Sequence, residues 1–424
     1  MKVLLIAANT EQIDMATIPL GLASVAESIK AHGHEVLFLD LMFQADLKTA
    51  LQETLEKEQP GCIGISVRNI DDQRMESTRF LLTKVKVIID LCREKTQVPI
   101  VLGGAGYTIF PHAVLTFLGA DLGIAGEGEG AFPALLEALE TGKSLEGVPG
   151  LHRADREGES PKSFMKELDN FPLPDLALLL EDVKKNPDPW IPVQTRRGCP
   201  LACSYCSTPK IEGTAIRERS PEAVVDWLKQ WVEVGYTQFY FVDNTFNLPV
   251  PYAKALCREM ISQKLGCTWS AIVYPGQMDA ELVDLMAESG CVRVSIGFES
   301  GSEKMLRVLN KHFTLDDVRA ACACFQNKAI QCMGFLLLGG PGETRETVKE
   351  SLDFADSLNL DSLRVTVGIR IYPDTEVVAA AVERGLVSVE DTLLTPVFYL
   401  EPELAQWLPA KVAEWTKTRP YALG

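Results

Sequence analysis

Apolar residues in the first third of the chain fall into short runs, separated by longer segments in which they recur at helical spacing. The short runs are Lys2–Ala8, Glu35–Asp40, Cys62–Val67, Pro99–Gly103 and Asp121–Ala125. Runs of this length and apolarity are typical of buried parallel strands, and the segments between them predict helices, including one over Met75–Glu94. This alternation predicts an α/β domain over residues 1–140, with a doubly wound five-stranded parallel sheet.

Glycine-rich loops follow the last two of these strands. Gly103 and Gly104 come after the fourth strand, and Gly126, Glu127 and Gly128 come after the fifth. Ligands of doubly wound sheets bind beyond the carboxyl ends of the strands, and glycine lets the backbone approach a ligand closely. We therefore expect a ligand site at this edge, with tight turns as the plainer alternative. Neither loop has the spacing of a phosphate-binding loop.

The same alternation returns after a proline-rich linker over residues 141–189. The strand-like runs are Ile191–Arg196, Gln238–Val242, Thr268–Val273, Val292–Phe298, Gln331–Leu338 and Ser362–Ile369. Helical spacing follows each run, so residues 190–375 predict a partial (β/α)6 barrel. Residues 376–424 predict a helical segment that packs over the mouth or side of this barrel.

Composition narrows the possible function classes. The chain has 41 Lys and Arg against 58 Asp and Glu, a net charge of −17, which argues against nucleic acid as the principal ligand. The apolar fraction of 46% and the charged fraction of 23% are those of a globular protein. Since no apolar run approaches the roughly 18 residues of a membrane span, we expect no transmembrane segment and a cytoplasmic protein with reduced cysteines.

Three of the eleven cysteines stand together on one loop. Cys199, Cys203 and Cys206 have the spacing C-x3-C-x2-C, between Gly198 and the next helical segment. Soft thiolates select iron–sulfur clusters or zinc. A closed structural zinc site needs a fourth ligand nearby, and the loop offers none. The spacing therefore favours an iron–sulfur cluster with one open position, and a zinc loop is the alternative.

The cysteine loop resembles the cluster motif of radical S-adenosylmethionine (SAM) enzymes. The resemblance lies in Arg197-Gly198-Cys199, in the spacing to Cys203 and Cys206, and in the aromatic Tyr205 before the last cysteine. It implies that the three cysteines are catalytic and hold a [4Fe–4S] cluster whose open iron is chelated by SAM. In that family one electron cleaves SAM, and the resulting 5′-deoxyadenosyl radical abstracts hydrogen from a substrate.

Residues at the carboxyl ends of the barrel strands are the candidates for SAM binding. The candidates are Tyr205, Asp243, Ser295, Glu299 and Leu336. Leu336 belongs to Gly334–Thr344, which resembles the family's segment beside the adenine. Where the family often carries Gly-Gly-Glu for the methionyl amine, this chain has Val242–Asn244, and Asp243 can serve instead.

A doubly wound domain before a radical SAM barrel resembles the cobalamin-binding members of this family. Pro19–Leu22, His32–Val36 and Gly126–Glu129 are similar to segments of that subfamily. The resemblance implies contacts with cobalamin from a set of residues in the loops. These are Pro19, Leu20, Arg68, Asn69, Gly103, Gly104, Gly126, Glu127 and Gly128.

One departure concerns the lower face of the cobalt. The Asp-x-His-x-x-Gly motif, by which many cobalamin proteins supply an axial imidazole, does not occur in the sequence. Arg68 stands in the loop after the third strand, and a protonated guanidinium cannot ligate cobalt. Our hypothesis is that Arg68 lies under the corrin and excludes a lower ligand. The alternative is that it pairs with Asp71, Asp72 or a corrin amide.

The resemblance implies a methyltransferase that uses SAM twice, once to methylate Co(I) and once to form the radical. The expected acceptor is an unactivated carbon, or phosphorus, of a small molecule, a lipid precursor or a peptide. Reduction would come from a donor such as flavodoxin or ferredoxin. The alternatives are a cobalamin-dependent radical cyclisation, rearrangement or oxidation without methyl transfer, and a non-catalytic cobalamin- or redox-responsive binding protein.

Overall fold

A computed structural model describes residues 1–12, 15–156, 160–171 and 173–423, which form two compact units. Unit 1 comprises Met1–Asp72, Thr78–Pro189 and Lys210–Gly213. Unit 2 comprises Gln73–Ser77, Trp190–Pro209 and the chain from Thr214 onward.

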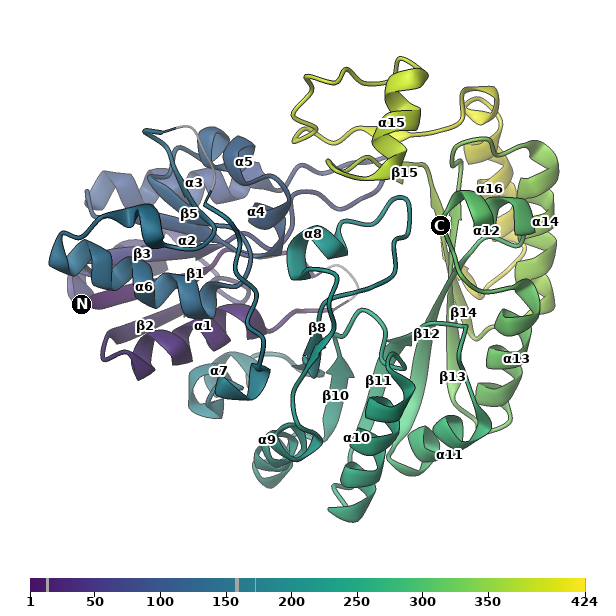
Figure 1. Ribbon diagram of the computed structural model, residues 1–424, viewed down its shortest axis with the longest axis horizontal. Helices are drawn as coiled ribbons and strands as arrows, with labels where there is room; N and C mark the ends of the chain where they lie inside the picture. The colour runs from purple at the N-terminus through teal and green to yellow at the C-terminus, as the bar shows by residue number, and fades with distance from the viewer. Residues whose placement is uncertain (13–14, 157–159, 172, 424) are drawn as a thin grey trace. The chain divides into compact units, whose positions relative to one another are not determined.

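The sheet of unit 1 has the strand order β2-β1-β3-β4-β5-β6 (Figure 1). Its strands are β1 (Lys2–Ala7), β2 (Glu35–Asp40), β3 (Cys62–Ser66), β4 (Ile100–Gly103), β5 (Leu122–Ile124) and β6 (Leu151–Arg153). The first five are parallel, as predicted, and β6 adds an antiparallel edge. The order reverses between β1 and β3, so the topological switch point lies there.

Helices cover both faces of this sheet. They are α1 (Leu20–Ala31), α2 (Leu47–Glu58), α3 (Leu82–Lys95), α4 (Ala105–Ile109), α5 (Pro111–Leu118), α6 (Gly128–Thr141) and α7 (Leu176–Val183), with 3-10 turns η1 (Leu145–Gly147) and η2 (Leu168–Asn170). The helix predicted from Met75 begins only at Leu82. The preceding residues form a turn in which the backbone N–H of Arg79 donates to Asp72 (3.1 Å) and Asp71 bridges Phe80.

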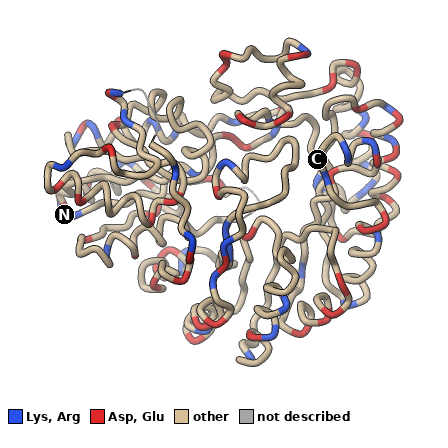
Figure 2. Tube along the Cα trace, in the orientation of Figure 1, with Lys and Arg blue, Asp and Glu red and all other residues tan. Residues whose placement is uncertain are grey.

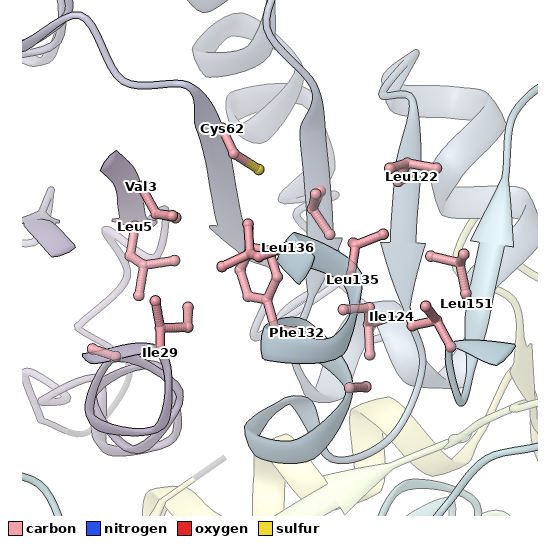
Figure 3. Close-up of a cluster of buried hydrophobic side chains, with 14 residues drawn as sticks. Val3, Leu5, Ile29, Cys62, Leu122, Ile124, Phe132, Leu135, Leu136 and Leu151 are labelled. Atoms are coloured by element: carbon pink, nitrogen blue, oxygen red, sulfur yellow. The ribbon is translucent and has the colours of Figure 1, made fainter. Parts of the chain in front are cut away.

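One part of the core of unit 1 lies between the sheet and α1 with α6 (Figure 3). Val3 and Leu5 of β1 face Phe132 and its neighbours on α6. Gly64 of β3 makes this approach possible, because a Cβ there would lie 2.6 Å from Leu5 and 2.7 Å from Phe132. The close packing holds α6, and with it the loop that precedes it, against the sheet.

The sheet of unit 2 has the order β17-β14-β13-β12-β11-β10-β7. Its strands are β7 (Ile191–Val193), β10 (Gln238–Phe241), β11 (Thr268–Val273), β12 (Cys291–Glu299), β13 (Gln331–Leu338), β14 (Ser362–Val367) and β17 (Ala422–Leu423). All neighbouring pairs are parallel. The six consecutive strands β7 and β10 to β14 form the predicted partial barrel.

The helices between these strands lie on the outer side of the curved sheet (Figure 1). They are α9 (Pro221–Glu233), α10 (Val250–Ser262), α11 (Ala280–Glu288), α13 (Leu315–Gln326) and α14 (Arg345–Ser357). Shorter elements are α8 (Thr208–Glu212), α12 (Glu303–Val308), η3 (Pro402–Leu404), the pair β8 (Arg196–Arg197) with β9 (Arg217–Glu218), and the pair β15 (Ile369–Arg370) with β16 (Phe398–Tyr399). Ser220 and Thr314 accept backbone hydrogen bonds as caps of α9 and α13.

Two segments differ from the sequence-based prediction, which made residues 141–189 a linker and residues 376–424 a helical segment. Residues 141–189 belong to unit 1, because Val148 and Leu151 are buried and β6 pairs with the edge of β5. The C-terminal segment contains the strands β16 and β17 in addition to the helices α15 (Glu376–Glu383) and α16 (Leu408–Lys417), and α16 packs at β14 on the side of the barrel, as predicted. Among the described residues, no helix is both long and apolar enough to cross a bilayer.

Candidate functional site

The cysteine loop begins immediately after β8. Gly198 has a φ of +92°, and a Cβ there would lie 2.0 Å from the carbonyl oxygen of Ala215, so only glycine fits. Cys199 is buried, whereas Cys203 and Cys206 are partly exposed. Within the described residues, no three His, Cys, Asp or Glu side chains stand close enough to share one metal ion. Cysteines that each bind a different iron of a cluster need no such convergence.

Segments far along the chain hold this loop in place. The backbone N–H of Ser204 donates to the carbonyl of Leu309 (3.2 Å), and its carbonyl accepts from the N–H of Val377 in α15 (3.2 Å). The side-chain amide of Asn310 donates to the carbonyl of Ala202. The loop is thus fixed from two sides by backbone contacts.

Asp243 lies at the end of β10, but its carboxylate faces the strand before the cysteine loop. It accepts from the Thr195 N–H (2.9 Å), the Thr195 hydroxyl (2.7 Å) and the Arg196 N–H (3.1 Å). Burial raises the pKa of Asp243, and the Arg196 guanidinium opposes this. Because both oxygens are already engaged and the residue is 1% exposed, Asp243 positions the strand end and is not placed to bind the SAM amine.

Tyr205 and Glu299, both predicted at the SAM site, are in contact. The Tyr205 hydroxyl donates to Glu299 Oε1 (2.9 Å), and the Lys311 ammonium lies 3.4 Å from the same oxygen. Lys311 Nζ also lies 5.2 Å from the centre of the Tyr205 ring. Burial raises the pKa of Tyr205 well above its usual value. Sequence reasoning missed Lys311, because a single lysine between helices carries no distinguishing pattern.

The other two SAM candidates are Ser295 on β12 and Leu336 on β13, and their side chains lie on opposite faces of the barrel sheet. Along β12, Ser295 and Glu299 share the half-exposed face. Along β13, Phe335 and Leu337 lie on the half-exposed face, whereas Leu336 is on the covered face and 1% exposed. The side chain of Leu336 therefore points away from the open face of the sheet, and only its backbone is available to a ligand there.

The loop after β13 is shaped by two buried glutamates that sequence reasoning also missed. Glu343 accepts from the backbone N–H groups of Gly339 and Gly340, and Glu401 accepts from Gly342 (2.7 Å). Burial raises the pKa of Glu343 to about 7. By accepting these backbone hydrogen bonds, the two carboxylates hold a glycine-rich loop that has few side chains of its own to pack.

In unit 1 a small open cavity lies at the switch point, beyond the carboxyl ends of β1 and β3. Its lining residues are Ala8, Asn9, Thr10, Glu11, Ser66, Arg68, Asn69, Leu81, Lys84 and Val85. The Arg68 guanidinium donates to the Thr17 hydroxyl (3.0 Å). Asp72, one of the partners considered for Arg68, accepts a hydrogen bond from Arg79 (3.0 Å).

The glycine-rich loops of unit 1 are tied to one another at the same edge. The Thr108 hydroxyl donates to the Gly104 carbonyl (2.9 Å) and accepts from the Gly126 N–H (3.0 Å). Gly104 has a φ of +98°, and a Cβ there would lie 2.7 Å from the carbonyl oxygen of Val67. The structure thus brings Gly103, Gly104 and the loop over residues 126–128 together. Thr108, which links them, carried no signal in the sequence.

The remaining cobalamin candidates lie at the ends of helices. Leu20 is the first residue of α1 and is buried, with Pro19 before it. Gly128 begins α6, and Glu127 precedes it. The Glu127 carboxylate accepts from the backbone N–H of Met165 (2.6 Å), so it fastens a neighbouring segment of unit 1.

Positive charge in unit 2 is concentrated at β8 and β9 (Figure 2). Arg196, Arg197, Arg217 and Arg219 are each 9% exposed or less. Buried arginines cannot form the open basic surface that binds a nucleic-acid backbone. Acidic residues are distributed over the rest of the chain.

Comparison with known families and proteins agrees with this geometry. Residues 193–355 match the Radical SAM superfamily, and residues 7–136 match the B12 binding domain. An uncharacterized methyltransferase of Pyrococcus horikoshii is 27% identical over 95% of this chain and 88% of its own length. Tryptophan 2-C-methyltransferase of Streptomyces laurentii is 26% identical, over 86% of this chain and 72% of its own.

A solved structure shares the architecture. The radical SAM methyltransferase TsrM of Kitasatospora setae, with cobalamin and a [4Fe–4S] cluster bound, superposes with a TM-score of 0.81 at 25% identity. The match covers 90% of this chain and 75% of TsrM. Both units of this chain therefore have counterparts in known proteins.

Proposed function

Because the chain belongs to the cobalamin-binding radical SAM enzymes, we propose that it methylates an unactivated carbon, or phosphorus, of a small molecule. The observation that carries the proposal is the joining of the C-x3-C-x2-C barrel to a B12-binding sheet in one chain. The two relatives reported above, matched over 88% and 72% of their own length, are named methyltransferases, which favours methylation over cyclisation or oxidation.

The residues present fit the three cofactors of this family: the cluster, SAM and cobalamin. Three soft thiols on one loop suit an iron–sulfur cluster and leave one iron for SAM. The glycine-rich loops at the carboxyl edge of the sheet allow the close backbone approach that a large flat ligand such as a corrin requires. When bound, the cluster supplies the electron for SAM cleavage, and cobalamin carries the methyl group.

In unit 2 we assign residues to two of the cofactors, the iron–sulfur cluster and SAM. We assign Cys199, Cys203 and Cys206 to the cluster, and Tyr205, Ser295 and Glu299 to SAM. Support comes from the contact between Tyr205 and Glu299 beside the cysteine loop, and from the shared open face of Ser295 and Glu299.

In unit 1 we assign the loops around Asn69, Gly104 and Gly126 to cobalamin, with Pro19 and Leu20 at the start of α1. Arg68 is exposed at the mouth of the cavity, and its contact with Thr17 directs the guanidinium. If cobalamin binds at this edge, Arg68 would lie against the corrin and, being protonated, would add no ligand to the cobalt.

The proposal also includes the cell compartment, the electron donor and the class of substrate. We place the enzyme in the cytoplasm, where a small reduced flavodoxin or ferredoxin donates electrons to the cluster. The substrate is a small molecule, a lipid precursor or a peptide, because the clustered arginines are buried and the net charge is −17.

The test is the stoichiometry of SAM products in an anaerobic turnover assay with candidate acceptors. Radical methylation uses one SAM as the methyl source and one as the radical source. We therefore expect S-adenosylhomocysteine and 5′-deoxyadenosine in equal amounts, with one methylated product for each pair. The variant with all three cluster cysteines changed to alanine is the control and should form no 5′-deoxyadenosine.

Other product ratios would contradict the proposal in distinguishable ways. 5′-Deoxyadenosine without S-adenosylhomocysteine would indicate cyclisation or oxidation. S-adenosylhomocysteine alone would retain methyl transfer but exclude hydrogen abstraction by the radical. Full turnover by the cysteine variant would exclude the radical SAM assignment altogether.

A further inference from the structure

We propose that Lys311 is a positioning residue of the iron–sulfur cluster, and that its ammonium makes the cluster easier to reduce. This inference rests on the assignment of the cluster to Cys199, Cys203 and Cys206. It adds a specific source of control over the electron transfer that precedes SAM cleavage.

Lys311 is held rigidly beside the cysteine loop. Its backbone N–H donates to the carbonyl of Leu306 (2.8 Å), and its side chain is only 7% exposed. Both neighbours are anchored as well, since Asn310 donates to Ala202 of the loop and the N–H of His312 donates to the Tyr274 hydroxyl (3.0 Å). The position of the ammonium is therefore determined by contacts on three consecutive residues.

The Lys311 ammonium has two neighbours, the carboxylate of Glu299 and the aromatic ring of Tyr205. It lies 3.4 Å from Glu299 Oε1, and it also lies 5.2 Å from the centre of the ring of Tyr205, which stands between Cys203 and Cys206 on the cysteine loop. The positive charge of Lys311 and the negative charge of Glu299 therefore both lie beside the cysteine loop.

The two charges have opposite effects on the reduction of a cluster held by this loop. Reduction adds one negative charge to the cluster, and a nearby positive charge stabilises the reduced form. Net charge and hydrogen bonds to the sulfurs are among the factors that set iron–sulfur potentials. Burial strengthens the effect, because charges interact more strongly where water is excluded. Lys311 should raise the midpoint potential, and Glu299 should lower it.

The experiment is a redox titration of the reconstituted holoprotein without SAM, followed by the electron paramagnetic resonance signal of the reduced cluster. We expect Lys311→Met to shift the midpoint potential to more negative values and Glu299→Gln to shift it to more positive values. Lys311→Arg, which keeps the charge, should stay close to wild type. The Lys311→Met/Glu299→Gln double variant should lie closer to wild type than Lys311→Met.

Lys328→Met is the matched control for the loss of one lysine. Lys328 is partly exposed and pairs with Asp284 (2.6 Å), away from the cysteine loop. Its substitution should leave the midpoint potential unchanged. Iron and sulfide analysis of each variant separates a change of potential from a loss of cluster.

Opposite shifts in the two single variants support the proposal, because general damage to the site would move both in the same direction. An unchanged or more positive potential in Lys311→Met would overturn it, as would shifts of the same sign. If Lys311→Met fails to bind the cluster, the decision falls to Glu299→Gln, which must shift positive, and to Lys311→Arg, which must not shift. A wild-type protein with a cluster but no methyl transfer would contradict only the proposed function, and one without a cluster would overturn both.

Discussion

Two carboxylates at the ends of barrel strands show how strongly the surroundings decide a residue's role. Asp243 and Glu299 occupy similar places in the sequence pattern, and both were candidates to bind SAM. Asp243 is buried and accepts three hydrogen bonds from Thr195 and Arg196, whereas Glu299 contacts Tyr205 on the half-exposed face. Buried acceptors that are fully satisfied contribute to stability, and only Glu299 remains accessible for ligand chemistry.

Arg68 is a residue whose role can be tested directly by spectroscopy. If its guanidinium occupies the space under the corrin, bound methylcobalamin should show the absorption spectrum of cobalt without a nitrogen lower ligand. Replacement by an imidazole should supply that ligand, because neutral histidine binds metals and arginine does not. We expect Arg68→His to convert the spectrum to the nitrogen-ligated form.

Arg68→Lys is the control, since it keeps a positive charge and adds no ligand. Its spectrum should match that of wild type. A nitrogen lower ligand in the wild-type protein would contradict the placement of Arg68.

At the scale of elements, the cysteine loop is defined less by its own sequence than by what surrounds it. The pair β8 and β9 fixes its start, α15 and the segment after α12 contact its middle, and Gly198 turns the chain between strand and loop. The loop therefore depends on elements from three parts of the barrel sequence.

Gly198→Ala should reduce cluster content and lower the melting temperature. Two effects add up, because alanine is disfavoured at positive φ by about 1–2 kcal/mol and its Cβ would lie 2.0 Å from the Ala215 carbonyl oxygen. Iron analysis and thermal unfolding measure the two consequences.

Gly235→Ala separates the two effects. Gly235 has a φ of +96°, but a Cβ there would meet nothing within 4 Å. It should lower the melting temperature modestly and leave cluster content unchanged. Equal cluster loss in both variants would show that the contact with Ala215 is irrelevant.

At the scale of the whole molecule, each unit has its own sheet, and the residues proposed for the cluster and for the glycine-rich part of the cobalamin site belong to different units. The three cysteines lie in unit 2, whereas the glycine-rich loops lie in unit 1. Units with their own cores are able to hold their ligands separately.

Cobalamin binding should therefore survive the loss of the cluster. We expect the variant with Cys199, Cys203 and Cys206 changed to alanine to bind hydroxocobalamin with the wild-type dissociation constant. Gly104→Val is the reciprocal variant, because its side chain would collide with the Val67 carbonyl and disturb the loop. It should lose cobalamin and retain iron. Spectroscopic titration and iron analysis test both, and loss of cobalamin binding in the cysteine variant would contradict the separation.

The sequence by itself determined the α/β fold of the two domains and the six barrel repeats, and it singled out the three cysteines that we propose hold the cluster. These features are local, because strand and helix periodicity and the spacing of the cysteines are contained in short segments. Alternation along β13 showed two faces, but only the folded barrel decided that Leu336 lies on the covered one. Long-range contacts also assigned residues 73–77 to unit 2 and added β6 to the first sheet. The surroundings of Lys311 and Thr108 were decided in the same way, because only the folded chain brings Tyr205 beside Lys311 and the loop at Gly126 beside Thr108.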